Sequence, residues 1–450
     1  MKKILIASAG GASSEGVINS LLSSSKSERI LGMGSEPSDL VLSNAHEKYY
    51  IPYANSTNYK DSLLGLLKTV QPDLVHFQND LEIYNASKFR DEIHSLGVKT
   101  FMPSHDVIDT CVHKYKTYLK FKEAGIKVPN NIIINNEEDL KQAFSELGDK
   151  NGKIWIRALS ISGGGLGSLP TNDFKFAKGW IDYYDGWGEF VAAEILTPET
   201  VTWLSIWHEG ELVVAQTRIR KGWTHGKRTV SGVSGVTKVG QTFSDPSVDR
   251  ISIETIKAVS NKPHGIFGVD MAYDKNGIPN PTEINISRFF TTVLFFTEAG
   301  LNMPEIFKNI ALYNEFPSLK TKINPLANGL LWLRGMDTKP RLMTSEQMTS
   351  EEIIRLSREY TFFSWSVQGA LDPIAIDRAE GVYLYTPEGK RILDFNAQLM
   401  SVNIGHGDRR VVDAITEQAT RLQFVQPAFA TEIRARLGAK MAEILPGDMN

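Results

Sequence analysis

The chain has 450 residues, 42% of them hydrophobic and 22% charged, with a formal net charge of −3 at pH 7. This composition is typical of a soluble globular protein of about three domains, and the charge gives no reason to expect a nucleic-acid or membrane partner. The single cysteine, Cys111, excludes an intrachain disulfide and a multi-cysteine metal site, and it fits a cytoplasmic location.

Residues 1–108 are expected to form a parallel sheet covered by helices on both faces, because strand and helix patterns alternate along them. Strands are expected at 4–7 and 73–77, and helices at 15–22 and 89–96. The apolar run at the start is too short for a signal peptide or a membrane span. The Gly10-Gly11 turn either holds a phosphate at a helix N-terminus or closes a tight turn. The missing G-x-G-x-x-G spacing favours the tight turn.

The pattern changes at residue 109, where longer strands and a possible hairpin predict α+β architecture within an overall α/β chain. Helices are expected at 114–123, 137–147 and 248–260, and strands at 132–134, 153–158 and throughout 190–239. The segment 268–286 reads as a hairpin with Asn276-Gly277 at its turn. Residues 316–360 connect to a further unit at 361–450, with expected elements at 345–358, 381–385, 391–395 and 410–422.

A glycine-rich loop follows the strand that carries Arg157. Residues 160–168 contain four glycines and three serines. Such a loop presents backbone amides and closes over a polyphosphate without interference from Cβ atoms, whereas the alternative is an ordinary flexible surface loop. Arg157 adds a fixed positive charge beside it. The candidate phosphate-binding residues of the loop are Ser162, Gly163, Gly164, Gly165 and Gly167.

Oxygen-bearing side chains at 270–285 predict a metal site. Asp270 lies on one apolar strand, and Glu283 and Asn285 lie two residues apart on the next, so that they face the same side. Two carboxylates and an amide oxygen suit Mg²⁺ or Mn²⁺ bound together with substrate phosphates. Arg288 nearby is a candidate for stabilising charge on a transferring phosphoryl group. The alternative is a structural ion pair or a solvated face, which the poor strand propensity of Glu and Asn disfavours.

In this order and spacing the motifs resemble the ATP-grasp superfamily, in particular the large subunit of carbamoyl-phosphate synthase. The resemblance covers about residues 1–315. It implies a Rossmann-like domain at 1–108 that precedes a two-lobed ATP-grasp fold at 109–315. It also implies phosphate contacts from Lys114 and Arg157, and an adenine-binding hinge at Glu194, Ile195 and Leu196. Many members have lysine where this chain has Arg157. Arg288 stands one residue farther from Asn285 than is usual, and no ribose-binding acid is evident.

The activity implied by the resemblance is that of an ATP- and Mg²⁺-dependent ligase. Such an enzyme activates a carboxylate as an acyl phosphate, and an amine or similar nucleophile then attacks it. Arg218 and Arg220 share one strand face and are candidates for binding the acidic substrate, with a solvated basic face as the alternative. A carbamoyl-phosphate-synthase-like phosphotransferase acting on bicarbonate or carbamate remains open, as does a non-catalytic ATP-binding module.

From residue 361 the chain resembles the start of a class III, fold type I aminotransferase. The resemblance rests on Phe363-Ser364-Trp365-Ser366, Asp377-Arg378-Ala379-Glu380-Gly381, Tyr385, Asp394-Phe395-Asn396-Ala397-Gln398 and Asn403-Ile404-Gly405-His406-Gly407. It implies pyridoxal phosphate as cofactor and a homodimer when that domain is complete. Residues 361–450 end before the family's cofactor-binding residues, so transamination by this chain alone is not expected. His406, between two glycines, is expected to be structural.

Overall fold

The computed structural model describes residues 1–24, 26–159, 167–335, 341–344 and 348–447. It divides into two compact units, Met1–Ser345 and Glu346–Asn450. Both units mix helices with strands, as the predicted α/β class requires. The boundaries expected at residues 108 and 315 fall inside the first unit, which contains three sheets. Within the described residues no helix has the length and apolar character needed to cross a membrane.

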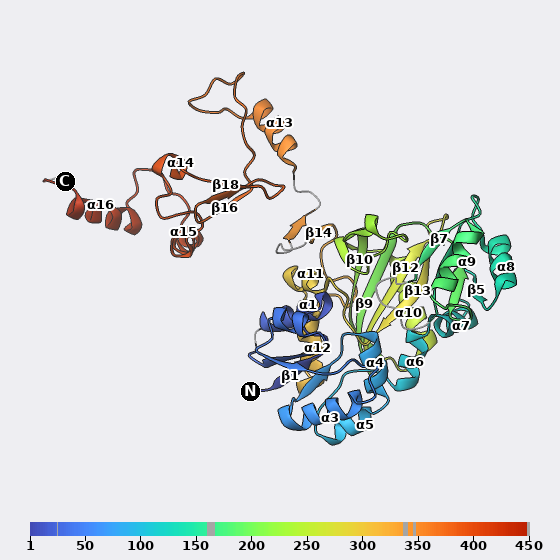
Figure 1. Ribbon diagram of the computed structural model, residues 1–450. Coiled ribbons are helices and arrows are strands. Elements are labelled where there is room, and N and C mark those ends of the chain that lie inside the picture. The colour runs from blue at the N-terminus through green and yellow to red at the C-terminus, as the bar shows by residue number, and fades with distance from the viewer. Residues whose placement is uncertain (25, 160–166, 336–340, 345–347, 448–450) are drawn as a thin grey trace. The chain divides into compact units, whose positions relative to one another are not determined.

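The first unit begins with a parallel sheet in the order β3-β2-β1-β4, as the alternating pattern predicts. Its strands are β1 (Lys3–Ile6), β2 (Arg29–Gly34), β3 (Glu47–Tyr50) and β4 (Leu74–His76). Helices α1 and α12 lie on one side of this sheet and α3 and α5 on the other (Figure 1). The helices of this region are α1 (Ala12–Leu22), α2 (Pro37–Leu42), α3 (Tyr59–Val70), α4 (Asp80–Ser87), α5 (Arg90–Ser95) and α12 (Met303–Tyr313).

A seven-stranded sheet in the order β13-β12-β9-β10-β11-β14-β15 forms the centre of the first unit, and all its pairs are antiparallel. Its strands are β9 (Thr200–His208), β10 (Glu211–Trp223), β11 (Thr237–Phe243), β12 (Gly265–Tyr273), β13 (Pro279–Ile286), β14 (Leu330–Leu333) and β15 (Arg341–Thr344). The predicted hairpin is β12–β13. Gly277 at its turn has φ +74°, which glycine adopts without strain.

Side chains of β9 alternate between two hydrophobic clusters, one on each face of the large sheet. Trp203 belongs to one cluster together with Leu5 of β1, and Leu204 belongs to the other together with Ile4. Because each cluster contains residues of both sheets, the parallel sheet and the seven-stranded sheet share their hydrophobic cores. Helices α10 (Pro246–Val259) and α11 (Val293–Glu298) contribute further buried residues to these clusters.

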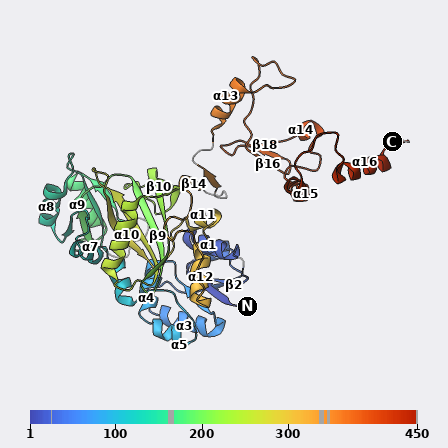
Figure 2. The same ribbon diagram turned by 180° about the vertical axis from the view of Figure 1, so that it is seen from behind.

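A third sheet, in the order β5-β8-β6-β7, forms a separate lobe at the edge of the first unit, visible from behind in Figure 2. Its elements are β5 (Asn131–Ile134), α8 (Glu137–Leu147), β6 (Ile154–Ala158), β7 (Leu169–Thr171), α9 (Phe174–Tyr183) and β8 (Phe190–Ala193). This lobe has its own hydrophobic cluster, in which Leu140 and Ile156 are fully buried. Helices α6 (His105–Val112) and α7 (Lys114–Glu123) precede it along the chain.

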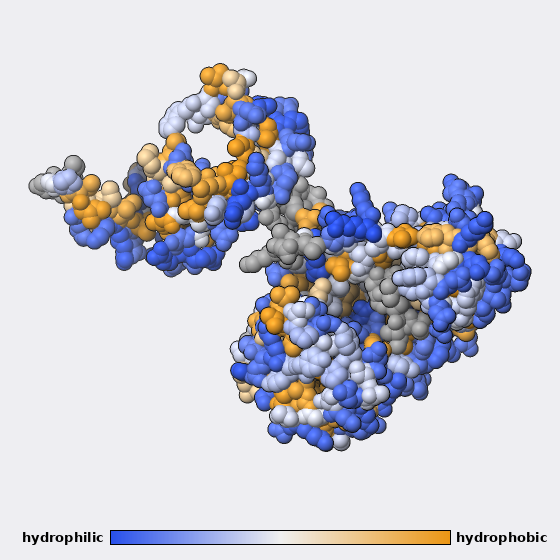
Figure 3. All heavy atoms as spheres, in the orientation of Figure 1, coloured by the Kyte–Doolittle hydropathy of each residue, from blue (hydrophilic) through white to orange (hydrophobic). Residues whose placement is uncertain are grey.

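The second unit contains a three-stranded antiparallel sheet and four helices. The strands are β16 (Arg378–Glu380), β17 (Tyr383–Tyr385) and β18 (Arg391–Leu393), and the helices are α13 (Ser350–Tyr360), α14 (Ala397–Met400), α15 (Arg409–Arg421) and α16 (Glu432–Ile444). None of these helices buries a residue. Large apolar side chains such as Trp365 and Phe395 are exposed, and hydrophobic residues gather on this unit's surface in Figure 3. His406, which was expected to be structural, has its Nε2 2.8 Å from Asp394 Oδ2.

A buried carboxyl group on α4 makes the stability of the first unit depend on pH. Burial raises the pKa of Glu82 to about 7, and the hydrogen bond from Ser8 Oγ at 2.7 Å opposes this only in part. A carboxyl whose folded pKa is raised favours folding fully below its unfolded pKa near 4.5. That contribution is lost as the pH rises through about 7.

Replacing Glu82 with glutamine is therefore expected to raise the free energy of unfolding at about pH 8 by up to ~3 kcal/mol, with no gain near pH 4.5. Glutamine mimics the neutral carboxyl and still accepts a hydrogen bond from Ser8. Denaturant unfolding at both pH values measures the change, and Glu36→Gln, an exposed position in the same region, is the control. Equal shifts at the two pH values would show that ionisation of Glu82 is not the cause.

Candidate functional site

The residues predicted to bind a metal lie together on the β12–β13 hairpin. Asp270 pairs directly with Glu283, and Gly268 pairs with Asn285, so that the three polar side chains share one face of the large sheet. Asn285 Nδ2 donates to Asp270 Oδ2 at 3.0 Å. No group of three or more His, Cys, Asp or Glu side chains suited to a metal occurs in the described part of the chain. The candidate donor set is thus two carboxylates and one amide.

Two cations from other parts of the unit surround Glu283. Lys114 Nζ, at the first position of α7, lies 3.6 Å from Glu283 Oε2, and its backbone N–H donates to Leu159 O at 3.1 Å. Arg157, on β6 of the small lobe, donates from Nη1 to Thr282 O at 3.3 Å. Burial alone would raise the pKa of Glu283. Lys114 and Arg157 outweigh it and hold this pKa below its usual value, so the carboxylate stays ionised as a metal ligand requires.

The site carries a surplus of positive charge. Four cations, Lys114, Arg157, Arg220 and Arg288, act on Glu283. The carboxylates among them are Asp80, Asp270 and Glu283 itself. The Arg157 Nε atom is buried and has no hydrogen-bond partner within the described residues. A buried, unpaired donor in a cationic surrounding is suited to an anion such as a polyphosphate.

Arg288 is held by a residue that sequence reasoning did not identify. Its Nε and Nη2 donate to the two carboxylate oxygens of Asp80 at 2.6 and 3.1 Å, and Nη2 also donates to Asn285 Oδ1. Asp80 is the first residue of α4, the helix that follows parallel strand β4. A signal was present in the sequence, because polar residues just after a parallel strand lie at the sheet edge where such folds bind ligands.

Arg218 and Arg220 are near the candidate metal-binding face but differ in exposure and partners. Arg218 is 1% exposed, and its guanidinium donates to Thr202, Thr237 and Thr292 at 2.7–3.0 Å. Burial, together with Arg220, lowers the pKa of Arg218 to about 9, which leaves it charged at neutral pH. Arg220 Nη2 lies 3.9 Å from Asp270 Oδ1, and its guanidinium stacks over Trp223. Thr202 Oγ1 also donates to Asp270. Because Arg218 Nη2 donates to the same hydroxyl, Arg218 holds the group that binds this carboxylate.

The expected adenine-binding segment connects the small lobe to the large sheet. Glu194 follows β8, and its carboxylate accepts hydrogen bonds from the N–H and Nδ2 of Asn130 at 2.9 and 3.3 Å. Ile195 and Leu196 are half-buried, and Thr197 N donates to Tyr273 O at 2.9 Å, at the end of β12. The segment thus runs from one sheet to the other beside the candidate metal site.

The glycine-rich loop is only partly covered by the described residues. Ser162, Gly163, Gly164 and Gly165 lie outside them. Gly167 has φ +73°, and a Cβ atom there would lie 3.0 Å from the ring of Phe190, so this position requires glycine.

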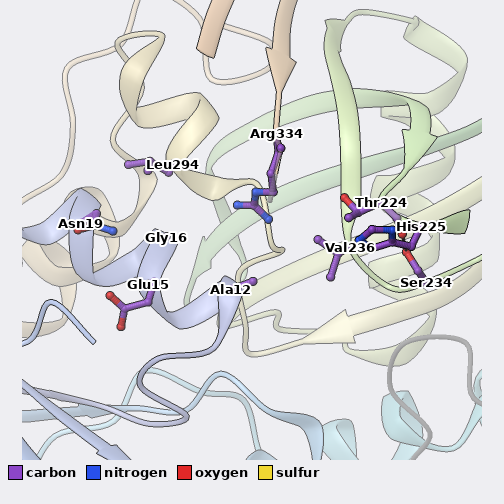
Figure 4. Close-up of a pocket in the computed structure, with 11 residues that line it drawn as sticks. Ala12, Glu15, Gly16, Asn19, Thr224, His225, Ser234, Val236, Leu294 and Arg334 are labelled. Atoms are coloured by element: carbon purple, nitrogen blue, oxygen red, sulfur yellow. Dashed lines mark hydrogen bonds between the residues drawn. The ribbon is translucent and has the colours of Figure 1, made fainter. Parts of the chain in front are cut away.

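A cavity of about 520 Å³ lies between α1, the β10–β11 connection, α11 and the end of β14. Figure 4 shows Arg334 pointing into the space between Ala12 and His225. Arg334 Nη2 donates to Thr291 O at 2.6 Å, and its Nη1 is buried without a partner in the described structure. Arg218 donates to Thr292, the residue next to Thr291, and also to Thr202, which donates to Asp270. The cavity therefore adjoins the hydrogen bonds that lead to Asp270. Arg334 was not identified from the sequence.

Solved structures similar to this chain are ATP-grasp enzymes. A biotin carboxylase from Campylobacter jejuni superimposes with a TM-score of 0.56 at 16% identity, over 74% of this chain and 75% of that one. A carboxyaminoimidazole ribonucleotide synthase from Aspergillus clavatus, complexed with ATP, gives 0.56 at 14% identity, over 74% and 81%. An L-amino acid ligase from Bacillus licheniformis gives 0.52 at 11%, over 94% and 97%. The ATP-grasp fold drawn from the motifs is thereby confirmed.

The C-terminal segment matches a different family. The model of the family "Aminotransferase class-III" matches residues 366–450. An uncharacterized aminotransferase of Bacillus subtilis (strain 168), YodT, is 37% identical over 76 residues, which are 17% of this chain and 17% of that protein. The mitochondrial ornithine aminotransferase of Drosophila ananassae is 38% identical over 61 residues, 14% of each chain. The chain thus spans less than a fifth of the length of these relatives, and it joins an ATP-grasp fold to a class III aminotransferase segment.

Proposed function

We propose that the first unit is an ATP- and Mg²⁺-dependent ligase that activates a carboxylate as an acyl phosphate for attack by an amine or similar nucleophile. The observation that carries the proposal is the face of Asp270, Glu283 and Asn285, placed among four cations within an ATP-grasp fold. Two hard carboxylates beside surplus positive charge match a nucleotide polyphosphate with its metal. Mg²⁺ bound by these three side chains would neutralise phosphate oxygens.

Each predicted residue receives a role in this proposal. Lys114, Arg157 and the amides of the glycine-rich loop hold the phosphates, and the segment Glu194, Ile195 and Leu196 receives the adenine. Arg288 stabilises the charge that develops on the transferring phosphoryl group. Arg220, beside Asp270, stays a candidate for the acidic substrate. Arg218 contributes through the threonines that it holds.

The reaction needs positioning and charge stabilisation rather than a protein nucleophile. An oxygen of the substrate carboxylate attacks the γ-phosphorus, a new O–P bond forms, and the bond from that phosphorus to the bridging oxygen of ADP breaks. The amine nitrogen then attacks the acyl carbon, phosphate leaves, and the nitrogen loses a proton. We place the acid and the amine in the cavity beside Arg334, whose guanidinium supplies a positive charge at the cavity wall for a carboxylate.

Bicarbonate is a second candidate substrate, since Arg157 stands where many ATP-grasp enzymes have lysine and where the large subunit of carbamoyl-phosphate synthase has arginine. The unit would then be a phosphotransferase on bicarbonate or carbamate. A nucleotide-binding module without catalysis is disfavoured, because Glu283 is kept ionised and is aligned with Asp270 and Asn285 on one face. Transamination is not part of the proposal for residues 366–450.

An oxygen-transfer experiment distinguishes these functions. Carboxylates of a panel, or bicarbonate, are labelled with ¹⁸O and incubated with ATP, Mg²⁺ and a panel of amines. If an acyl phosphate forms, one labelled oxygen appears in the released inorganic phosphate, which mass spectrometry detects. We expect transfer from a carboxylate only when an amine is also present. Label arriving from bicarbonate alone would favour the phosphotransferase. Tight ATP binding without ADP formation across the panel would leave the nucleotide-binding module as the function.

A further inference from the structure

Arg288 follows a strained turn at the end of β13. The preceding residue, Ser287, has φ +56°, a left-handed conformation that costs a non-glycine residue about 1 kcal/mol or more. The Ser287 N–H donates to Ile266 O at 2.7 Å, which fixes the turn from the side of β12. Strain of this kind persists only where the surroundings impose it, and the residue that follows, Arg288, pairs with Asp80 of α4.

Residues 78–80, at the start of α4, hold this turn at two separate points. Gln78 Oε1 accepts from the N–H of Phe289 at 2.8 Å, and Asp80 binds the Arg288 side chain through both carboxylate oxygens. Gln78 is itself fixed by buried His76, whose Nε2 lies 2.9 Å away. The residues on both sides of the Arg288 backbone, as well as its guanidinium, therefore have fixed positions.

We propose that Asp80 is a positioning residue for the reaction: it holds the Arg288 guanidinium at the phosphoryl-transfer site and keeps it off the metal-binding carboxylates. This inference rests on the proposed function, in which Arg288 stabilises the transferring phosphoryl group. Asp80 itself touches neither substrate nor metal. It acts through Arg288, and through Arg288 it reaches Asn285 and Asp270.

The geometry of the ion pair supports this role over a purely structural one. A two-pronged arginine–carboxylate pair fixes the plane of the guanidinium as well as its distance. It uses Nε and Nη2, so that Nη1 is taken by neither Asp80 nor Asn285. Prepositioned charge stabilises a transition state without reorganisation when the reaction occurs.

Competition among nearby carboxylates explains why Arg288 needs a dedicated partner. Burial lowers the pKa of Arg288, but Asp80, together with smaller contributions from Glu283 and Asp270, raises it above its ordinary value. Without Asp80, the nearest anions that attract Arg288 are therefore the two carboxylates proposed to bind Mg²⁺. Pairing with either would occupy a metal ligand and turn the cation away from the phosphate.

The test compares two nucleotide complexes and needs no knowledge of the acceptor. Isothermal titration measures the affinity of the full chain for ADP with Mg²⁺, and again with aluminium fluoride added as a mimic of the transferring phosphoryl group. In Asp80→Asn we expect the aluminium fluoride complex to weaken by about 10- to 100-fold, with MgADP affinity changed less than about threefold. Asp80→Glu should recover part of the loss, because it restores the charge.

A double-mutant cycle with Arg288→Gln separates positioning from a general structural role. If Asp80 acts through Arg288, adding Asp80→Asn to Arg288→Gln causes no further loss. Asp73→Asn, which removes an ion pair with Lys2 in the same sheet, is the control and should leave both affinities unchanged. An equal loss for MgADP and the fluoride complex in Asp80→Asn, or full additivity in the cycle, would overturn the inference. A wild-type chain that binds neither complex would overturn the proposed function together with it.

Discussion

Glu283→Gln is expected to lower ATP turnover by about 10²- to 10³-fold and to remove its dependence on Mg²⁺. Glutamine keeps the size of the side chain but loses the charge of a proposed metal ligand. It also leaves Lys114, Arg157 and Arg288 without the carboxylate that they surround. Free ADP should therefore bind the variant as well as, or more tightly than, MgADP, whereas the wild-type chain should prefer MgADP.

Two measurements check this expectation: ADP release as a function of Mg²⁺ concentration, and equilibrium binding of ADP with and without the metal. Glu254→Gln is a matched control, because Glu254 lies on the exposed side of α10, paired with Arg250. If Glu283→Gln leaves both the turnover and the preference for MgADP unchanged, Glu283 is not a metal ligand, and Asp270 is the only carboxylate left in the proposed metal site.

Lys308→Met is expected to reduce the free energy of unfolding by about 3–5 kcal/mol. Lys308 on α12 pairs with Glu28 at 3.1 Å, and their side chains are 0% and 1% exposed. Methionine fills the space but leaves the Glu28 carboxylate buried, with the Tyr313 hydroxyl at 2.9 Å as its remaining donor in the described structure. An uncompensated buried charge is costly because the interior does not solvate it.

Denaturant unfolding measures this loss, and two further variants test its cause. Lys262→Met removes an ammonium paired with Glu209 at the surface, where the side chains are 64% and 53% exposed, and should cost less than about 1 kcal/mol. Combining Lys308→Met with Glu28→Gln removes the charge left behind and should recover a large part of the loss. If the double variant is no more stable than Lys308→Met, lost packing rather than the unpaired charge is responsible.

Local sequence signals predicted those elements whose boundaries are set by residues close to them in the sequence. Helix α8 occupies the predicted residues 137–147, because Asn136 caps its first amides and Gly148 ends it. Strand β2 was not predicted, since Gly32 and Gly34 favour a turn. The structure shows why glycine is needed there: a Cβ atom on Gly32 would lie 2.7 Å from the Cβ of Ala9. That close approach between β2 and the loop that follows β1 is a tertiary contact, which no local pattern reveals.

The residues of the candidate site likewise fall into those that a local pattern groups together and those that only the fold brings together. Asp270, Glu283 and Asn285 could be grouped from the sequence because they lie on one hairpin, where strand periodicity fixes their common face. Asp80 could not be joined to Arg288, 208 positions away, because the fold alone brings them together. Arg218 was expected on a face open to substrate, and its 1% exposure results from helix and sheet packing that strand periodicity does not record.

The separate hydrophobic cluster of the β5-β8-β6-β7 lobe has a consequence for motion. The described residues of this cluster belong to neither of the two clusters that join the parallel sheet to the large sheet. The lobe can therefore rotate as a rigid body without exposing either shared core to water, with the segment 194–197 absorbing the change in backbone angles. Arg157 travels with the lobe, whereas Lys114 and Glu283 do not. Rotation would thus change the electrostatic field at the proposed phosphate site while the candidate metal-binding face stays fixed.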